Sequence, residues 1–148
     1  MPFPIMTLSA EDDPEWLRMR LLLWPEYSVA EHRRGMADWR AQPVGVVLVA
    51  DRVQGVGLAG FAEVGTRPYA DGCDSSPVAY LEGWYVDEDS RRRGVGRALV
   101  DAATAWARGQ GLREFASDAL LENQLSHRAH EAVGFTEVER LVIFRRPL

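Results

Sequence analysis

The chain has 148 residues, of which 47% are hydrophobic and 26% are charged, a composition typical of a soluble globular protein. Its 17 basic and 22 acidic side chains give a net charge of −5, which argues against nucleic acid as the main partner because phosphate backbones require a basic surface. No apolar run approaches the roughly 18 residues needed to cross a bilayer, so we expect no membrane association.

The N-terminus and the cysteine content bear on the cellular compartment. Residues 1–8 lack the basic region and the long apolar stretch of a secretory signal. Cys73 is the only cysteine, so no disulfide can form within the chain. We therefore expect a cytoplasmic protein whose residues 1–148 form one domain.

The first half of the chain predicts a strand, two helices and two further strands. Ser9-Ala-Glu-Asp12 and Ser28-Val-Ala-Glu31 resemble capping boxes, in which side chain and backbone pair reciprocally at the start of a helix. The elements expected here are a strand at 4–8, helices at 14–24 and 28–40, strands at 44–51 and 57–64 joined by a turn at 52–55, and a long loop at 65–77.

The stretch from residue 80 to residue 106 predicts a strand, a glycine-rich turn and a helix. Residues 80–86 favour a strand, residues 91–96 spell Arg-Arg-Arg-Gly-Val-Gly, and apolar residues then recur at helical spacing. Because the first N–H groups of a helix are unpaired and glycines let an anion approach them, we expect an anion site here. A solvated basic cap is the alternative. The arginines that add charge are Arg91, Arg92, Arg93 and Arg97.

Two common phosphate-binding patterns do not fit this turn. The Walker sequence is absent, and Leu99 stands where the dinucleotide fingerprint requires its third glycine. A strand followed by Arg-x-x-Gly-x-Gly resembles instead the acetyl-CoA pyrophosphate loop of the GNAT acyltransferases.

The remaining elements complete an α/β order. Gly109-Gln-Gly111 ends the helix, and Gly134 ends a later one. We expect a strand at 112–117, a helix at 123–133 and a final strand pair from Phe135 that includes residues 141–144. This order predicts a mixed sheet with helices on its faces and matches the GNAT fold along essentially the whole chain.

The resemblance to the GNAT fold implies that the strand at 80–86 and the strand at 112–117 splay apart and that acetyl-CoA enters the gap between them. We place a bulge that redirects the first of these strands at Gly83, for which a simple packing contact is the alternative.

Four further segments resemble the aminoglycoside 6'-N-acetyltransferases, namely Leu22-Leu-Trp-Pro25, Ser76-Pro-Val-Ala-Tyr-Leu-Glu-Gly83, Glu114-Phe-Ala-Ser-Asp118 and Asn123-Gln-Leu-Ser-His127. The resemblance implies transfer of an acetyl group from acetyl-CoA to an aminoglycoside 6'-amino group, and a homodimer whose C-terminal strands contribute to the partner. The implied aminoglycoside contacts are Trp24, Tyr27, Tyr69, Glu82, Asp118 and Glu139. The implied acetyl-CoA contacts are Trp84, Tyr85, Val86, Arg92, Arg93, Gly94, Val95, Gly96, Arg97 and Asn123.

Acetylation requires a neutral amine and therefore a carboxylate nearby. Glu82 stands within an otherwise apolar strand and Asp118 at the end of the neighbouring strand, so we expect both to be catalytic; a solvent-facing strand position and a turn or N-cap are the alternatives. The family usually has a tyrosine, as acid for the departing thiolate, where this chain has His130, so that proton could come from His130, Tyr85 or solvent. His127 and His130 alone do not make a metal site, and we expect no metal.

Two other functions remain open from the residues alone. One is a GNAT enzyme acting on a different amine, such as a polyamine, an amino acid or a protein N-terminus. The other is a CoA-binding module without turnover, against which the two carboxylates argue.

Overall fold

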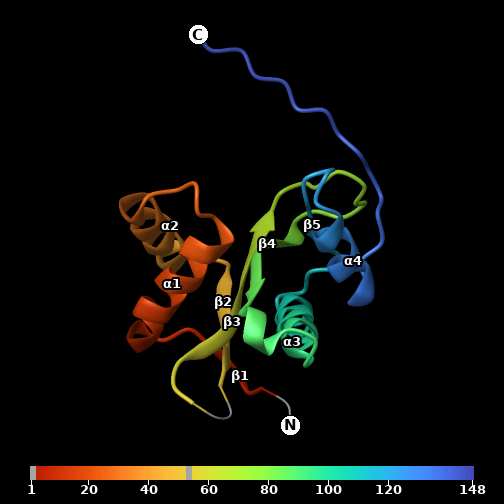
Figure 1. The fold of residues 1–148 in the computed structure, drawn as a ribbon. Helices are drawn as coiled ribbons and strands as arrows, with labels where there is room; N and C mark the ends of the chain where they lie inside the picture. The colour runs from red at the N-terminus through yellow and green to blue at the C-terminus, as the bar shows by residue number, and fades with distance from the viewer. Residues whose placement is uncertain (1–2, 53–54) are drawn as a thin grey trace.

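The computed structural model describes residues 3–52 and 55–148, which form a five-stranded sheet between two layers of helices (Figure 1). In chain order the elements are β1 (Ile5–Thr7), the 3-10 turn η1 (Ala10–Asp12), α1 (Asp13–Leu23), α2 (Val29–Ala41), β2 (Val46–Asp51), β3 (Leu58–Arg67), β4 (Val78–Val86), the 3-10 turn η2 (Glu88–Ser90), α3 (Val95–Gly109), β5 (Phe115–Ser117) and α4 (Gln124–Ala132). Residues 53 and 54 of the expected turn lie outside the described residues. Within the described part of the chain, no helix is long and apolar enough to cross a membrane.

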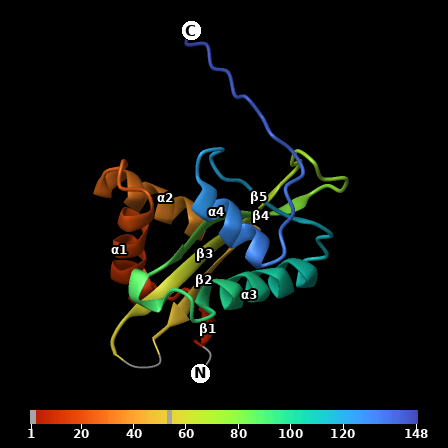
Figure 2. The same ribbon diagram turned by 45° about the vertical axis from the view of Figure 1, so that its right-hand side comes forward.

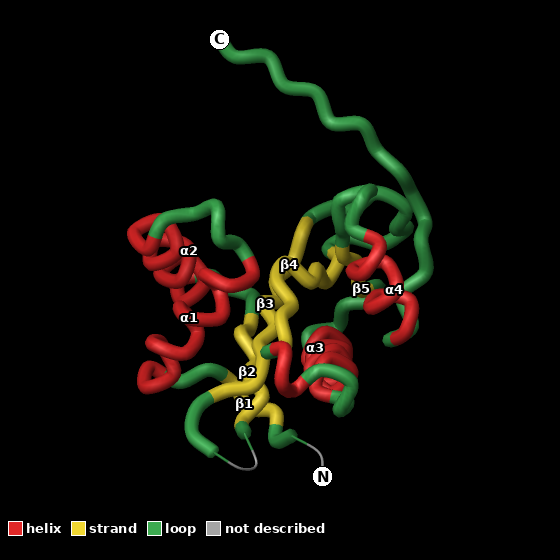
Figure 3. Tube along the Cα trace, in the orientation of Figure 1, coloured by secondary structure: helices red, strands yellow, loops and turns green. Residues whose placement is uncertain are grey.

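The strands follow one another across the sheet in the order β1-β2-β3-β4-β5. Neighbours are antiparallel except for β4 and β5, which are parallel, so the sheet is mixed as the sequence predicted. Helices α1 and α2 lie on one side of the sheet and α3 and α4 on the other (Figures 1 and 3).

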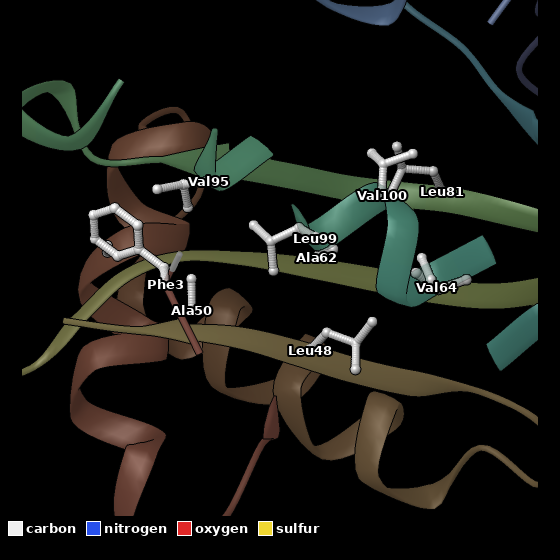
Figure 4. Packing of buried hydrophobic residues seen from close by; sticks show 11 residues of the cluster. Phe3, Leu48, Ala50, Ala62, Val64, Leu81, Val95, Leu99 and Val100 are labelled. Atoms are coloured by element: carbon white, nitrogen blue, oxygen red, sulfur yellow. The ribbon is translucent and has the colours of Figure 1, made fainter. Parts of the chain in front are cut away.

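Each face of the sheet has its own apolar core. The apolar stripe of α3, represented by Leu99 and Val100, packs on Leu48 and Val64 of the sheet (Figure 4). On the opposite face, α1 and α2 pack against β2 and β3. The members of that second core are Trp16, Met19, Met36, Val47, Val49, Leu58 and Phe61.

The helix starts read from the sequence are present. Ser28 Oγ accepts a hydrogen bond from the backbone N–H of Glu31 at 3.1 Å, and the backbone N–H of Ser28 donates to Glu31 Oε1 at 3.3 Å. At the first box the backbone N–H of Ser9 donates to Asp12 Oδ2 at 2.9 Å. That box opens the short turn η1 rather than the helix itself, and α1 begins one residue later, at Asp13.

A β-bulge lies in β4, next to the glycine where it was expected. Glu63 of β3 pairs with Gly83, whereas the next residue, Val64, pairs with Leu81, so Glu82 is the extra residue. Side chains normally alternate between the faces of a sheet, and an extra residue reverses the alternation beyond it. Leu81 and Trp84, three residues apart, accordingly both pack into the core beneath α3.

The strands β4 and β5 part soon after they meet. Their pairing covers only residues 79–81 of β4 and 115–117 of β5. Beyond Leu81, β4 continues to Val86 while β5 ends at Ser117. No strand of the described chain pairs with residues 82–86 on this side, which leaves an open backbone edge between the two strands (Figure 2).

The predicted final strand pair is wrong. Residues 133–148 contain neither helix nor strand, and their last part runs away from the body of the molecule (Figures 1 and 2). Ile143 and Phe144 are each 88% exposed. A strand needs a neighbour for its N–H and C=O groups, and within the described residues no strand pairs with this segment. We name residues 138–148 the C-terminal arm.

Candidate active site

A concave backbone lies at the start of α3, as the glycine-rich turn predicted. Gly94 has φ +84° and Arg92 has φ +63°, both in the left-handed region. The first hydrogen bond of the helix joins the N–H of Ala98 to the carbonyl of Gly94 at 2.9 Å, so the N–H groups of residues 95–97 precede it. The first turn of α3 contains no acidic residue. Such a cluster of N–H groups at the positive end of a helix is suited to bind a phosphate.

The arginines of this turn have different contacts. Arg91 Nε donates to the carbonyl of Val86 at 2.9 Å, and Arg97 donates to the carbonyl of Ala132 at the end of α4. The guanidinium of Arg93 lies 5.4 Å from the centre of the Phe3 ring. Within residues 3–52 and 55–148 none of the turn's arginines forms an ion pair with an acid, so their charge remains available to an anion.

Trp84 projects from the open edge of β4 toward α3 and α4. A Cβ atom added to Gly96 would lie 3.1 Å from the Trp84 ring, so the indole covers the first turn of α3 closely. The ring also meets His130 edge-on, with 5.2 Å between centroids. Trp84 Nε1 is buried and has no hydrogen-bond partner among the described residues. Buried polar groups are rarely left unpaired, so the acceptor for this N–H is not among the described residues.

His130 lies where β4 and β5 part. Its Nδ1 is 2.7 Å from the carbonyl oxygen of Ser126, and its Nε2 is 2.8 Å from Ser117 Oγ. Ser117 Oγ in turn is 3.2 Å from the carbonyl oxygen of Leu81. Since a carbonyl oxygen only accepts, Nδ1 donates to Ser126 and Ser117 Oγ donates to Leu81 in this arrangement.

Tyr85, the other residue considered as an acid, lies on the opposite face of β4. Its ring packs 6.2 Å from that of Phe61, in the core beneath α1 and α2. Burial, with the Asp87 carboxylate beside it, raises the pKa of Tyr85.

The two expected catalytic carboxylates, Glu82 and Asp118, come together around residues that the sequence analysis missed. Arg67 donates to Glu82 through Nε at 2.9 Å and through Nη2 at 2.7 Å, and Nη2 lies 4.0 Å from Asp118 Oδ2. The hydroxyl of Tyr80 donates to Asp118 Oδ2 at 2.5 Å. Burial and this carboxylate raise the pKa of Tyr80, so the phenol keeps its proton. We call Arg67, Tyr80, Glu82 and Asp118 the acidic cluster.

Trp24 is partly buried at the α1/α2 core and lies against Gly83, the residue that follows Glu82. A Cβ atom added to Gly83 would lie 2.7 Å from the Trp24 ring, so the absence of a side chain at Gly83 makes room for the indole. Both features considered for Gly83, a bulge and a packing contact, are therefore found. Gly83 directly follows the bulge residue Glu82, and it permits the close contact with Trp24. Tyr27, which is 50% exposed, meets the same buried His32 ring as Trp24 does, at 6.1 and 6.4 Å respectively.

The other expected substrate residues lie on a neighbouring loop and on the C-terminal segment. Tyr69 is 67% exposed and donates to Asp71. This hydrogen bond raises the pKa of Tyr69, with a smaller contribution from the charge of Glu139. Val138 lies against Gly72, where an added Cβ atom would come within 2.4 Å of it. Glu139 is thus near Tyr69, and among the described residues neither side chain forms a hydrogen bond or ion pair with the acidic cluster.

Asn123, expected to contact acetyl-CoA, is the N-cap of α4. Its side-chain oxygen accepts from the backbone N–H of Ser126 at 3.1 Å. That bond occupies the carbonyl oxygen of the amide and leaves its NH₂ group to bind a ligand.

A buried ion pair supports the substrate side of the site. Glu63, 1% exposed, accepts from Arg20 and from Trp16 Nε1, the latter at 2.9 Å. Arg20 Nε donates to His32 Nδ1 at 3.3 Å, and His32 Nε2 then donates to the carbonyl of Trp24 at 3.0 Å. This chain of hydrogen bonds runs from the centre of the sheet to the Trp24 backbone and fixes the end of α1.

The sequence contained only a weak signal for Arg67, which the sequence analysis missed. Arg67 fell in the expected loop at 65–77, but β3 extends to Arg67 and the loop is confined to residues 68–77. Continuing the alternation of β3 from Phe61 through Glu63 to Arg67 would have placed Arg67 on the face that carries the ion pair. For the described residues, no group of three or more His, Cys, Asp or Glu side chains is arranged to hold a metal ion.

Comparison with known proteins places this architecture in a family. The sequence model of the acetyltransferase (GNAT) family matches residues 16–135. The chain is 48% identical to aminoglycoside N(6')-acetyltransferase type 1 of Klebsiella aerogenes, over 97% of this chain and 96% of that protein. It is 45% identical to the protein of the same name from Stenotrophomonas maltophilia, over 97% and 93% of the two chains.

Solved structures agree with the sequence matches. The apo crystal structure of aminoglycoside antibiotic 6'-N-acetyltransferase AAC(6')-IG from Acinetobacter haemolyticus superposes with a TM-score of 0.92 and 35% identity, covering 98% of this chain and 99% of that one. AAC(6')-Iy in complex with the bisubstrate analog CoA-S-monomethyl-acetylneamine superposes with a TM-score of 0.92 and 32% identity over the whole of both chains. These matches confirm the fold that the sequence resemblance implied.

Removing Arg20 should destabilise the protein in a pH-dependent manner. Burial raises the pKa of Glu63 above 4.5, and Arg20 opposes the rise. In Arg20→Met the pKa of Glu63 rises further, and the unpaired carboxylate should cost about 3–5 kcal/mol of unfolding free energy at pH 8. A carboxyl whose pKa is higher in the folded state than in the unfolded state contributes most to the free energy of unfolding at low pH. That contribution is lost as the pH rises through the folded-state pKa. The loss should therefore be smaller at pH 5, as measured by urea denaturation.

The matched control is the double variant Arg20→Met/Glu63→Gln, which has no carboxyl at this position. It should lose less stability at pH 8 than the single variant and show little change between the two pH values. Equal losses at both pH values for Arg20→Met would contradict the role assigned to the pair.

Proposed function

The chain belongs to the acetyltransferase (GNAT) family, and we propose that it transfers the acetyl group of acetyl-CoA to the 6'-amino group of aminoglycosides. The proposal rests on one observation, which is that the open edge of β4 joins the glycine-rich turn before α3 at one end to the acidic cluster at the other. Residues 82–86 span about 13 Å at the rise of a β-strand. The relatives named above carry aminoglycoside acetyltransferase in their names, and the acidic cluster suits a polycationic substrate.

We place the pyrophosphate of acetyl-CoA at the N–H groups at the start of α3, with charge from Arg92, Arg93 and Arg97. Trp84, Tyr85 and Val86 would meet the pantetheine arm with their backbone groups, as an added strand would. We expect the Trp84 ring and the free NH₂ group of Asn123 to border acetyl-CoA on the side of α3 and α4.

On the substrate side, we propose that Glu82, Asp118 and Glu139 bind ammonium groups through charge-assisted hydrogen bonds. Trp24, Tyr27 and Tyr69 would offer flat surfaces to the sugar rings. Trp24 and Tyr27 come from the end of α1 and the residues after it, and both rings contact His32.

The chemistry assigned to these residues is direct acyl transfer. Glu82 or Asp118, directly or through water, takes a proton from the ammonium group so that the amine can attack the thioester carbon. The new C–N bond forms, the C–S bond breaks, and the amine releases its second proton to water. An N–H of β4 would polarise the thioester carbonyl. We assign protonation of the departing thiolate to His130, because it lies on the Trp84 side of β4 where the strands part.

We propose that the protein acts as a homodimer in the cytoplasm, where acetyl-CoA is available. The C-terminal arm carries exposed apolar side chains, and β5 has a strand partner only on its β4 side within the described residues. An arm that pairs with a second copy would satisfy its backbone and bury these side chains. The exposed apolar residues of the arm are Val138, Leu141, Val142, Ile143, Phe144 and Leu148.

Sedimentation velocity tests the dimer. The wild-type chain should sediment as a dimer, and Ile143→Asp/Phe144→Asp as a monomer, because the charges oppose burial of the arm. Val56→Asp is the matched control, since Val56 is 97% exposed in a distant loop and should not change the mass. A wild-type monomer would rule out the proposed assembly.

Purified protein should release CoA from acetyl-CoA when kanamycin or tobramycin is added, with the 6'-acetyl product identified by mass spectrometry and NMR. Glu82→Gln, Asp118→Asn and His130→Gln should each lower kcat by about 10²-fold or more, because the two carboxylates together receive the proton of the amine and His130 supplies that of the thiol. Acetyl-CoA affinity should change less than about threefold, since none of the three holds the pyrophosphate.

Three results of this assay would redirect the assignment. CoA release only with a polyamine or a peptide amine would support acyl transfer but show that the substrate is not an aminoglycoside. CoA binding without release for any amine would indicate a binding module. Unchanged kinetics in both carboxylate variants would remove Glu82 and Asp118 from the mechanism.

Gly94→Val should abolish CoA binding measured by calorimetry. The side chain projects into open space, so it meets no protein atom, but it blocks the turn and strains a residue at φ +84° by about 1–2 kcal/mol. Gly111→Val is the matched control, because Gly111 also has a positive φ of +78° with open space around it, at the other end of α3. Both variants should lose similar stability, and normal CoA binding by folded Gly94→Val would contradict the pyrophosphate site.

A further inference from the structure

We propose that Arg67 is an internal substitute for a substrate ammonium group. It occupies the space between Glu82 and Asp118 in the free protein, and a bound aminoglycoside displaces it. This inference rests on the proposed function, because it takes the acidic cluster to be where cationic substrate binds.

The contacts of Arg67 are those expected of a bound cation. Its Nε and Nη2 atoms donate to both oxygens of Glu82, at 2.9 and 2.7 Å. The same Nη2 lies 4.0 Å from Asp118 Oδ2. The guanidinium carbon lies 3.5 Å from the centre of the Tyr80 ring, a cation–π distance. An ammonium group that bound Glu82 and Asp118 together would need this same position.

Arg67 and a substrate ammonium cannot share the position. Both are positive, and like charges at hydrogen-bonding distance from the same carboxylate repel each other. The hydrogen bonds to Glu82 also raise the pKa of Arg67, so the guanidinium does not give up its charge to make room. While both Glu82 oxygens accept from Arg67, that carboxylate is poorly placed to receive a proton from an amine. Binding and catalysis therefore both require the guanidinium to move.

The position of Arg67 permits that movement. It is the last residue of β3, and its side chain is 42% exposed, so the guanidinium can swing into solvent without disturbing a core. The Tyr80–Asp118 hydrogen bond does not involve Arg67 and can hold Asp118 in place when Arg67 leaves. The ion pair of Arg20 and Glu63 provides the contrast, because its side chains are only 10% and 1% exposed and no ligand can replace the arginine there.

Because a ligand must displace Arg67 to bind, its affinity depends on how many ammonium groups it carries. A ligand with a single ammonium group replaces one cation by another and gains little. A polycation displaces Arg67 with one ammonium and brings further ammonium groups to the remaining acidic side chains. Arg67 thus acts as a specificity-determining residue that favours polycations over simple amines.

The test is the dissociation constant of kanamycin without acetyl-CoA, measured by isothermal titration calorimetry for wild type and Arg67→Gln. Loss of the competing cation should lower the dissociation constant about threefold to tenfold. Arg113→Gln is the matched control, since it makes the same change in net charge at an exposed residue outside the cluster and should change the constant less than about twofold. Arg67→Ala provides a second variant should the glutamine disturb the strand end, and its thermal unfolding is checked first.

The outcomes separate this inference from the proposed function. Wild-type protein that binds kanamycin, with both Arg67 variants binding it no more tightly, would overturn the inference and leave the function intact. Weaker binding by the variants would show that Arg67 organises the carboxylates instead of competing for them. Wild-type protein that binds no aminoglycoside would overturn the proposed function and this inference with it.

Discussion

The bulge at Glu82 is the feature on which the rest of the site depends. By adding one residue to β4 opposite Glu63 and Val64, it reverses the side-chain alternation in the middle of the strand. Before the bulge, Tyr80 faces Arg67 and the loop after β3; beyond it, Trp84 faces α3 and α4. The same point marks the parting of β4 from β5. One extra residue thus lets the even-numbered Tyr80 and Trp84 lie on opposite faces of the same strand.

Two arginine–glutamate pairs lie close to this bulge and differ in what they can do. Arg20 and Glu63 are buried, and their hydrogen bonds extend through His32 to Trp24, so the pair is a fixed support. Arg67 and Glu82 are partly exposed, and solvent or a ligand can compete for either partner. Burial makes separation of the first pair costly, whereas screening by water makes separation of the second easy. The protein therefore combines a rigid platform with an exchangeable charge pair.

Much of the architecture could be read from the sequence because it depends on local rules. Capping boxes, the apolar stripe of α3 and the glycine-rich turn each act within a few residues, and all were placed correctly. The final strand pair failed because a strand exists only beside a partner, and the apolar alternation of residues 141–144 says nothing about where that partner lies. Arg67 was missed for a related reason, since its importance comes from Glu82, fifteen residues away.

The sequence by itself determined the order of the elements from β1 to α4, the glycine-rich turn at the start of α3 and the two carboxylates that stand out from their surroundings. Only the tertiary structure decided that Glu82 is the bulge residue, that Arg67 and Tyr80 join it to Asp118, and that His130 and Tyr85 lie on opposite faces of β4. The physical reason is that helix starts and turns are set by short-range backbone bonding, whereas strand register and charge pairing depend on which distant segments meet.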